Sequence, residues 1–177
     1  MQRPEPSEYH EFYGPYIDAV PAGDILEHLD QGVRRTLEVL GGLPAEWETF
    51  RYEPGKWTVR EIVGHVTDAE RMYSYRALSV ARRDPATLPS MDRDLWLANS
   101  NAGSRPLPSL LEDFERARRS SIALFDSFDD DMWLHRGRAS AFEFTVRAFA
   151  YIIAGHEIHH RRVLEERYLK PLRERGS

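Results

Sequence analysis

The sequence predicts an all-α fold, a four-helix bundle with at least one long crossover connection. Four segments carry apolar residues at steps of three and four positions, the spacing that places side chains on one face of a helix. No segment shows the strict alternation of apolar and polar residues that is typical of a half-buried strand. Residues 84–108 contain four of the eleven prolines and form a connection long enough to join opposite ends of a bundle.

The first two helices are expected at about residues 22–40 and from Thr58 onward. The apolar stripe of the first consists of Leu26, Leu29, Val33, Leu37 and Leu40. A Gly-Gly pair followed by Pro44 ends this helix. The second begins with a capping box, in which the Thr58 hydroxyl accepts a bond from a free backbone N–H and Glu61 reaches back to the cap. Its buried stripe consists of Ile62, Val66, Ala69, Tyr73, Ala77 and Val80.

The third and fourth helices are expected to follow the long connection. The third is predicted to start at Ser109, where Ser109 and Glu112 have the spacing of a second capping box. The fourth is predicted at about residues 141–169, with Pro171 marking its end. Its apolar and histidine residues share related faces: Phe142, Phe149, Ile152, Ile153, His156, His160, Val163 and Leu164.

Composition limits the class of protein. The chain has 177 residues, a formal net charge of −5 and no cysteine. An acidic balance argues against a nucleic-acid partner, and the lack of cysteine excludes disulfides and thiolate zinc sites. No apolar run reaches the roughly 20 residues of a membrane helix, and the N-terminal segment lacks the apolar region of a secretory signal. We therefore expect a cytoplasmic protein without a membrane partner.

The chain is expected to form an arm and one domain. Residues 1–21 hold four prolines and are predicted to be an irregular arm. The aromatic residues of this arm indicate that it packs on the domain: Tyr9, Phe12, Tyr13 and Tyr16. Residues 22–170 are predicted to be the bundle domain.

Three histidines are candidates for a metal site. His156 and His160 are four residues apart, so they share one face of the fourth helix, and this face continues its apolar stripe. Buried imidazoles need partners, which are either a divalent metal or a carboxylate or carbonyl across the bundle. His65 borders the buried stripe of the second helix and is the candidate third ligand. Three imidazoles with an open fourth position are typical of a catalytic zinc site.

The segment His156-Glu157-Ile158-His159-His160 also matches the zinc-protease signature H-E-x-x-H. A protease needs a third ligand downstream, and Glu165 and Glu166 lie on the same straight helix. We therefore reject the protease interpretation. Glu157 is expected instead to be a surface carboxylate that pairs with Arg161, and His159 to lie outside the shared face of the two candidate ligands.

Two stretches carry a family resemblance. "YEPGKWTVREIVGHVTDAERMYSYRAL" and "AYIIAGHEIHHRRVLEERYL" together resemble the DinB-like (DinB/YfiT-like) superfamily of small four-helix metalloproteins. The resemblance covers about residues 22–169. It implies an up-down-down-up bundle with the long crossover between the second and third helices. It also implies one divalent metal at His65, His156 and His160, with zinc as first candidate and nickel or iron as others, and it implies a homodimer.

These observations favour a metal-dependent enzyme that acts on a small molecule, by hydrolysis or by S-transfer of a low-molecular-weight thiol. The competing hypothesis is a non-catalytic bundle, stabilised by its metal, that serves as a binding or scaffold module. Asp68 and Glu70 are candidates to orient an imidazole, with exposed helix acids as the alternative. Three aromatic residues are candidates to line a pocket, with core packing as the alternative: Tyr73, Trp96 and Trp133.

Overall fold

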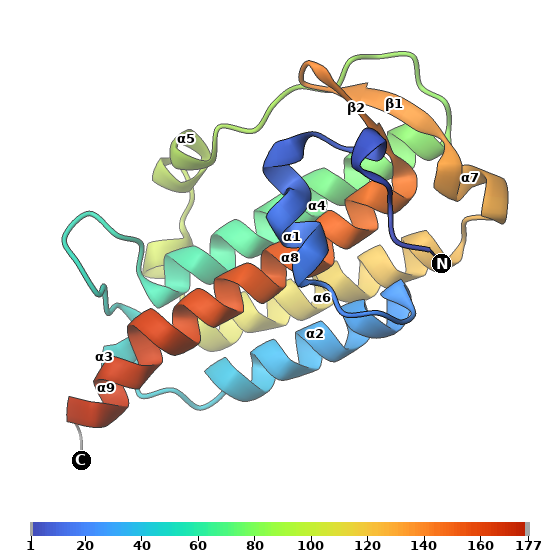
Figure 1. Cartoon of the computed structure of the whole chain (residues 1–177). Helices are drawn as coiled ribbons and strands as arrows, with labels where there is room; N and C mark the ends of the chain where they lie inside the picture. Colours follow the sequence, from blue (N-terminus) through green and yellow to red (C-terminus); the bar gives the residue numbers. More distant parts are fainter. Residues whose placement is uncertain (1, 176–177) are drawn as a thin grey trace.

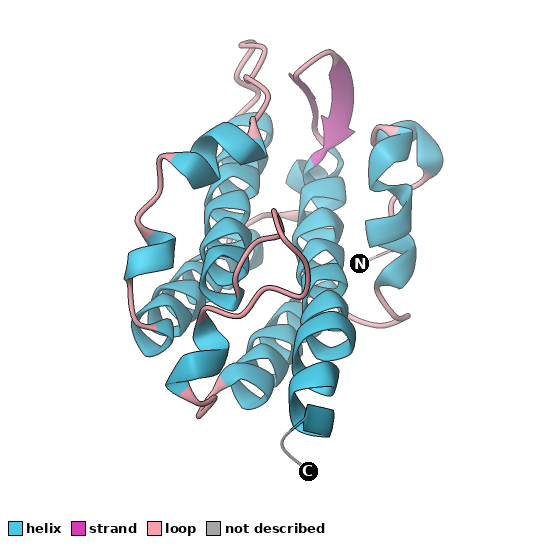
Figure 2. Ribbon diagram, turned by 90° about the vertical axis from the view of Figure 1, so that its left-hand side faces the viewer, coloured by secondary structure: helices cyan, strands magenta, loops and turns pink. Residues whose placement is uncertain are grey.

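A computed structural model describes residues 2–175 as a bundle of four long helices, surrounded by short helices and one β-hairpin (Figures 1 and 2). The long helices are α2 (Ile25–Leu40), α4 (Val59–Ala81), α6 (Leu107–Asp126) and α8 (Val146–Val163). The short helices of the N-terminal half are η1 (Pro6–Glu8), η2 (Glu11–Tyr13), α1 (Gly14–Ala19) and α3 (Ala45–Glu48). The later elements are α5 (Arg93–Ala98), η3 (Ala102–Ser104), α7 (Asp130–Leu134), β1 (Arg136–Ala139), β2 (Phe142–Thr145), the π-helical segment η4 (Leu164–Leu169) and α9 (Lys170–Arg175).

The four long helices have the up-down-down-up order. Figure 1 shows α2 and α8 running in one direction, and α4 and α6 in the opposite one. Helix α4 packs against α6 and α8, and α2 packs against the same two helices. The connection that carries α5 and η3 returns the chain from the end of α4 to the start of α6. The predicted bundle and its long crossover are therefore confirmed.

The start of α4 is the capping box that the sequence predicts. The Thr58 hydroxyl accepts a hydrogen bond from the backbone N–H of Glu61 at 3.2 Å, and the Glu61 carboxylate accepts one from the backbone N–H of Thr58 at 2.7 Å. This reciprocal pair satisfies two backbone donors that a helix start leaves free. It fixes the first turn of the helix that carries His65.

The predicted capping box at Ser109 is wrong. Helix α6 starts two residues earlier, at Leu107, with Pro106 in the cap position and no side-chain cap from its own segment. The backbone N–H of Leu107 donates instead to the Glu48 carboxylate of α3 at 3.1 Å. Because Glu48 is also held by the Arg60 guanidinium at 2.8 Å, a distant part of the chain supplies the cap.

A β-hairpin occupies residues for which the sequence analysis predicts no strand, including the start of the predicted fourth helix. Strand β1 pairs with β2 in antiparallel register, from Arg136 opposite Thr145 to Ala139 opposite Phe142. Helix α8 consequently begins at Val146 rather than near residue 141, and the Thr145 hydroxyl caps it. The hairpin also holds the crossover, because the backbone N–H of Leu88 donates to the carbonyl of Arg138 at 2.9 Å.

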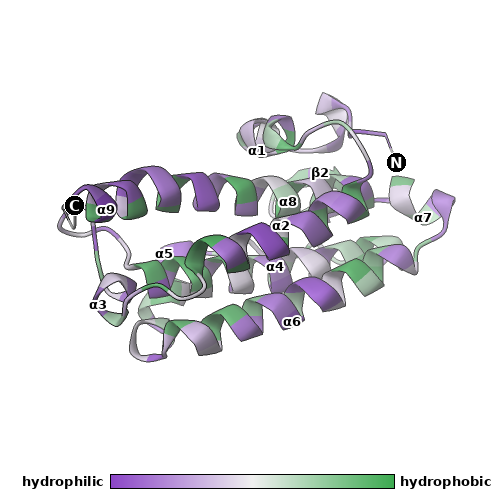
Figure 3. Ribbon diagram, turned by 90° about the horizontal axis from the view of Figure 1, so that it is seen from below, coloured by the Kyte–Doolittle hydropathy of each residue, from purple (hydrophilic) through white to green (hydrophobic). Residues whose placement is uncertain are grey.

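The interior consists of two hydrophobic clusters with a charged layer between them. Figure 3 shows that hydrophobic and hydrophilic stretches alternate along the long helices. On α4 the buried Glu70 lies between Val66 of one cluster and Tyr73 of the other. Arg118 of α6 has a similar place and is fully buried.

Arg118 is the centre of this layer. Its Nε donates to Glu70 at 2.7 Å, and its Nη1 lies 3.3 Å from the Glu157 carboxylate and 2.8 Å from the carbonyl of Leu29. Glu157 also accepts a bond from the Thr36 hydroxyl at 2.6 Å. One ionic network therefore ties all four long helices together.

The N-terminal arm lies on the outer side of α8, through α1 (Figures 1 and 3). The approach is close at Gly155, because a Cβ there would overlap with the backbone carbonyl of Tyr16. The Arg3 guanidinium donates to the carbonyl of Ile17 at 2.7 Å, and Glu8 pairs with Arg147 of α8. The arm thus covers the helix that carries His156 and His160.

Candidate metal centre

The structure brings together the three histidines that the sequence analysis selected. His65 projects from α4, and His156 and His160 project one turn apart from α8, which packs against α4. The Nε2 atom of His156 lies 3.2 Å from that of His65 and 3.1 Å from that of His160. One ring nitrogen from each of the three lies within 4.8 Å of the others. Three nitrogen donors therefore converge on one point.

The environment of these imidazoles keeps them neutral. Burial, with the positive charge of Arg93 as a smaller cause, lowers the pKa of His65 to about 4. Burial also lowers the pKa of His156 and of His160 well below 6.5, and the neighbouring imidazoles of the cluster act in the same direction. At neutral pH each ring is uncharged, which is the form that binds a metal ion.

Two aromatic rings surround the cluster. The Trp57 ring lies 4.8 Å from the His65 ring, and the Tyr16 ring of the arm meets the His156 ring edge-on at 5.5 Å.

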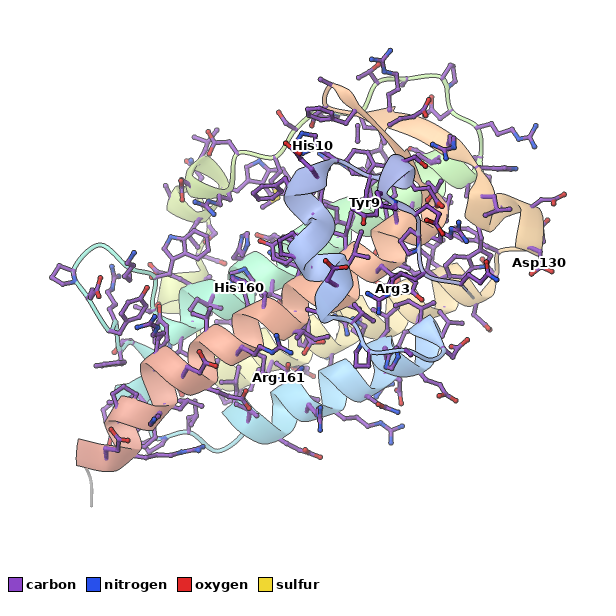
Figure 4. All side chains as sticks on the ribbon, viewed as in Figure 1. Arg3, Tyr9, His10, Asp130, His160 and Arg161 are labelled. Atoms are coloured by element: carbon purple, nitrogen blue, oxygen red, sulfur yellow. The ribbon has the colours of Figure 1, made fainter. Side chains whose placement is uncertain are left out.

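Figure 4 shows His160 on the side of α8 that faces α4, and Arg161 on the side that faces α2. The histidine cluster and the charged layer therefore lie on different faces of α8.

A cavity of about 470 Å³ opens beside the three histidines. Its walls are the arm, the crossover around Met91, one face of α4, Ser140 of the hairpin turn, and α8 at His156, His159 and His160. On α4 the lining residues follow a helical repeat that starts at the first histidine: His65, Ala69, Met72, Tyr73 and Arg76. The sequence analysis missed Arg76, although its position in this repeat was a signal that could have found it.

Glu157 has a different role from the predicted one. Its expected pairing with Arg161 is present, but the side chain is buried instead of exposed. It faces Thr36 and Arg118 in the charged layer, away from the cavity. In residues 2–175, the metal-ligand candidates that gather at this place are only the three histidines, so the carboxylate of the H-E-x-x-H segment is not among them.

In residues 2–175, neither acid proposed to orient an imidazole forms a hydrogen bond or an ion pair with a histidine of the cluster. Asp68 pairs with Arg71 on the surface at 3.3 Å. Glu70 is buried, which contradicts its alternative as an exposed acid, and it is bound to Arg118. Asp68 and Glu70 thus have other partners.

The three candidate aromatic residues have three different positions. Tyr73 belongs to the core and also lines the cavity, with its ring 6.3 Å from the His156 ring. Trp133 stacks on Phe125 in the core at 5.5 Å. Trp96 is 43% exposed on α5, so it is neither a core residue nor part of this cavity wall.

A four-helix bundle with three neutral histidines beside an open cavity defines the class of protein: a helical-bundle protein with a candidate metal centre. The family model of the DinB superfamily matches residues 28–164. The chain therefore belongs to the DinB superfamily, as the resemblance implied. The matched region includes all three histidines and all four long helices except the first residues of α2.

Individual relatives agree with this assignment. A protein of Oceanobacillus iheyensis named "Putative metal-dependent hydrolase" is 25% identical over 139 residues, which are 76% of this chain and 78% of the relative. YfiT from Bacillus subtilis, described as "a probable metal-dependent hydrolase with an unusual four-helix bundle topology", superposes with a TM-score of 0.70 at 17% identity, over 99% of this chain and 94% of its own. The mycothiol-dependent maleylpyruvate isomerase superposes with a TM-score of 0.64 at 13% identity, over 82% of this chain and 61% of its own. The two structural matches establish the fold.

In residues 2–175 no helix has both the length and the apolar character that crossing a membrane requires.

Proposed function

We propose that the chain is a metal-dependent enzyme in which His65, His156 and His160 hold one divalent ion. Zinc is the first candidate, and nickel and iron are the alternatives, since all three ions accept imidazole ligands. The observation that carries the proposal is the convergence of three neutral ring nitrogens, within 4.8 Å of one another, beside a cavity of about 470 Å³.

The donor set fits a catalytic site better than a structural one. Structural zinc sites are closed by four protein ligands, whereas catalytic sites have three and keep one position open. In the described part of the chain, no fourth histidine, aspartate or glutamate joins the cluster. A divalent ion held there would supply Lewis acidity, which activates water or a thiol and polarises a substrate.

The residues of the chain around the cluster would bind the substrate and exclude water. Burial raises the pKa of Tyr73 well above 10, and the neighbouring Tyr13 adds to this effect, so the Tyr73 hydroxyl stays protonated and can donate a hydrogen bond. Burial also raises the pKa of Tyr16. Two phenol groups that remain donors at neutral pH suit a substrate with oxygen acceptors.

The reaction we propose is hydrolysis of a small molecule or transfer of a low-molecular-weight thiol to it. The hydrolase names of two similar proteins support the first reaction, and the thiol dependence named for a third supports the second. Both need the same open position beside the three histidines. We further propose that the protein is cytoplasmic and forms a homodimer. Light scattering on the purified protein tests the dimer.

Metal analysis with a matched pair of variants tests the proposed centre. The wild-type protein is expected to hold about one divalent ion per chain after metal supplementation. His156→Ala should lower both the metal content and the melting temperature, because it removes the central ligand. His159→Ala is the control, since His159 is an exposed neighbour on the same helix.

Two results would refute the centre: a wild-type content below about 0.2 ion per chain, or an unchanged content in His156→Ala. Activity is then sought with simple esters and amides, and with thiols combined with electrophiles. A metal-loaded protein that turns over none of these substrates, with a fourth protein ligand closing its coordination shell, would favour the non-catalytic binding or scaffold module.

A further inference from the structure

Arg76 is a buried cation that has no carboxylate partner within residues 2–175. It lies on α4, is 3% exposed, and forms part of the cavity wall beside the three histidines. Its guanidinium donates to the carbonyl of Pro89 in the crossover and stands 5.8 Å from the centre of the Tyr73 ring. In residues 2–175 it takes part in no recorded ion pair. One carbonyl uses only part of the five N–H donors of a guanidinium.

The other shielded arginines of the bundle are paired. Arg118 lies between two carboxylates, Arg60 pairs with Glu48, and Arg147 pairs with Glu8. A buried charge is costly unless it is paired, so an unpaired one is expected where a ligand supplies the missing charge. Arg76 differs from the paired arginines in lining a cavity that is large enough for a small molecule.

The cavity links Arg76 to the candidate metal centre. His65 and Arg76 lie on one face of α4, eleven positions or about 16 Å apart along the helix axis. Tyr73 lies between His65 and Arg76 in the sequence. Its ring is 6.3 Å from the His156 ring and 5.8 Å from the Arg76 guanidinium, so it is near both the histidines and Arg76. A single small molecule that fills this space can therefore reach the histidines with one end and Arg76 with the other.

The remaining charges of the cavity lie at its opening. Asp92, Arg93 and Asp94 belong to the start of α5 and are exposed, and Asp92 already caps that helix. The rest of the wall has apolar and aromatic residues, among them Met72 and Met91, together with the polar side chains of Ser90, Ser140 and His159. The end of the cavity at Arg76 is thus cationic, and apolar side chains are available beside it.

We propose that Arg76 binds a carboxylate group of the substrate, and that the substrate is a small monocarboxylate with an aromatic or aliphatic body. The planar guanidinium matches a carboxylate with two parallel hydrogen bonds. The carboxylate occupies the end of the cavity at Arg76, and the opposite end of the molecule lies at the histidines. This inference rests on the proposed function, because it names the substrate class of the same site.

Matched ligands that differ only in charge test this inference. Binding of 3-phenylpropanoate and of 3-phenylpropanamide is measured by calorimetry on the full-length protein, both as purified and after treatment with a chelator. The wild-type protein should bind the carboxylate at least about tenfold more tightly than the amide, a difference of about 1.4 kcal/mol. The preference should remain after chelation, because Arg76 and not the metal provides it.

Variants of Arg76 distinguish an effect of its charge on binding from an effect on the fold. Arg76→Gln keeps a donor for the carbonyl of Pro89 but removes the charge, and it should abolish the preference. Arg76→Lys should retain part of it. Arg71→Met is the control, because it removes a positive charge from an exposed position of the same helix. Circular dichroism and thermal unfolding verify that each variant is folded.

Three results would overturn the inference: no carboxylate preference in the wild type, a preference that survives in Arg76→Gln, or a preference that disappears on chelation. Metal content is measured on the same samples. A protein that holds no metal but prefers the carboxylate through Arg76 would refute the proposed enzyme and keep the carboxylate site. A protein that holds metal but shows no carboxylate preference would keep the proposed metal centre and refute the carboxylate site.

Discussion

Replacement of Arg118 by methionine tests the charged layer at the centre of the bundle. Arg118 is fully buried and is the only recorded ion-pair partner of Glu70 in the described residues. Arg118→Met leaves the Glu70 carboxylate buried without a cation. Removing one partner of a buried ion pair costs about 3–5 kcal/mol, which is a large part of the roughly 5–15 kcal/mol that stabilises a typical domain. Glu157 keeps Arg161 and Thr36, so the loss is expected to come mainly from Glu70.

Urea unfolding followed by circular dichroism measures this loss. Arg119→Met is the matched control, because Arg119 is the next residue and pairs with Asp30 and Glu115 at the surface, where a salt bridge contributes about 0–1 kcal/mol. The double variant Arg118→Met with Glu70→Met should recover most of the loss, since it removes Arg118 and Glu70 together and leaves Glu157 paired with Arg161. The reasoning is refuted if Arg118→Met is no less stable than the control, or if the double variant is less stable than the single one.

Two further predictions concern the N-terminal arm. Gly155→Ala should lower the free energy of unfolding by about 1–3 kcal/mol, because its Cβ overlaps with the Tyr16 carbonyl and α1 must move. Urea unfolding measures this change. Gly14→Ala is the control, because a Cβ at Gly14 meets no atom within 4 Å. Burial disfavours the charge of Glu8, but its hydrogen bonds, above all with Arg147, outweigh burial and lower its pKa from 4.5 to about 2. The stabilisation, up to roughly 3 kcal/mol, is complete above pH 4.5 and is lost as the pH falls towards 2, so Glu8→Gln should be less stable at pH 7 and lose less between pH 5 and pH 2. An equal acid-induced loss in both proteins would contradict this assignment.

Local patterns in the sequence were sufficient for the bundle and for the grouping of the histidines. Each long helix has a continuous apolar stripe, and stripes of this kind can be buried only against one another. The Thr58 capping box depends on residues three positions apart, so the sequence contains all of it. The spacing of His156 and His160 is likewise a property of one helix. His65 could be added because its place on a facing stripe was also readable.

The features that the sequence analysis missed depend on contacts between distant residues. The cap of α6 comes from Glu48, which makes a local capping box at Ser109 unnecessary. The hairpin has two strands of only four residues each, and its edge is completed by Leu88 of the crossover. The burial of Glu157 follows from Arg118, which lies on another helix. Glu48, Leu88 and Arg118 are too far along the chain from the residues they contact to leave a local signal, and the adjacent strands of the hairpin are too short to show a clear alternation.

The position of His156 next to Glu157 has a mechanical consequence for α8. The two side chains leave the helix about 100° apart, one towards the cavity and the other towards the charged layer. Any rotation of α8 that moved the histidines would also pull Glu157 away from Arg118 and Thr36. The charged layer thus fixes the rotation of α8 about its own axis before any ion is bound. An ion entering the cluster would meet ligands that are already aimed, so its binding free energy would go into coordination and not into ordering the chain.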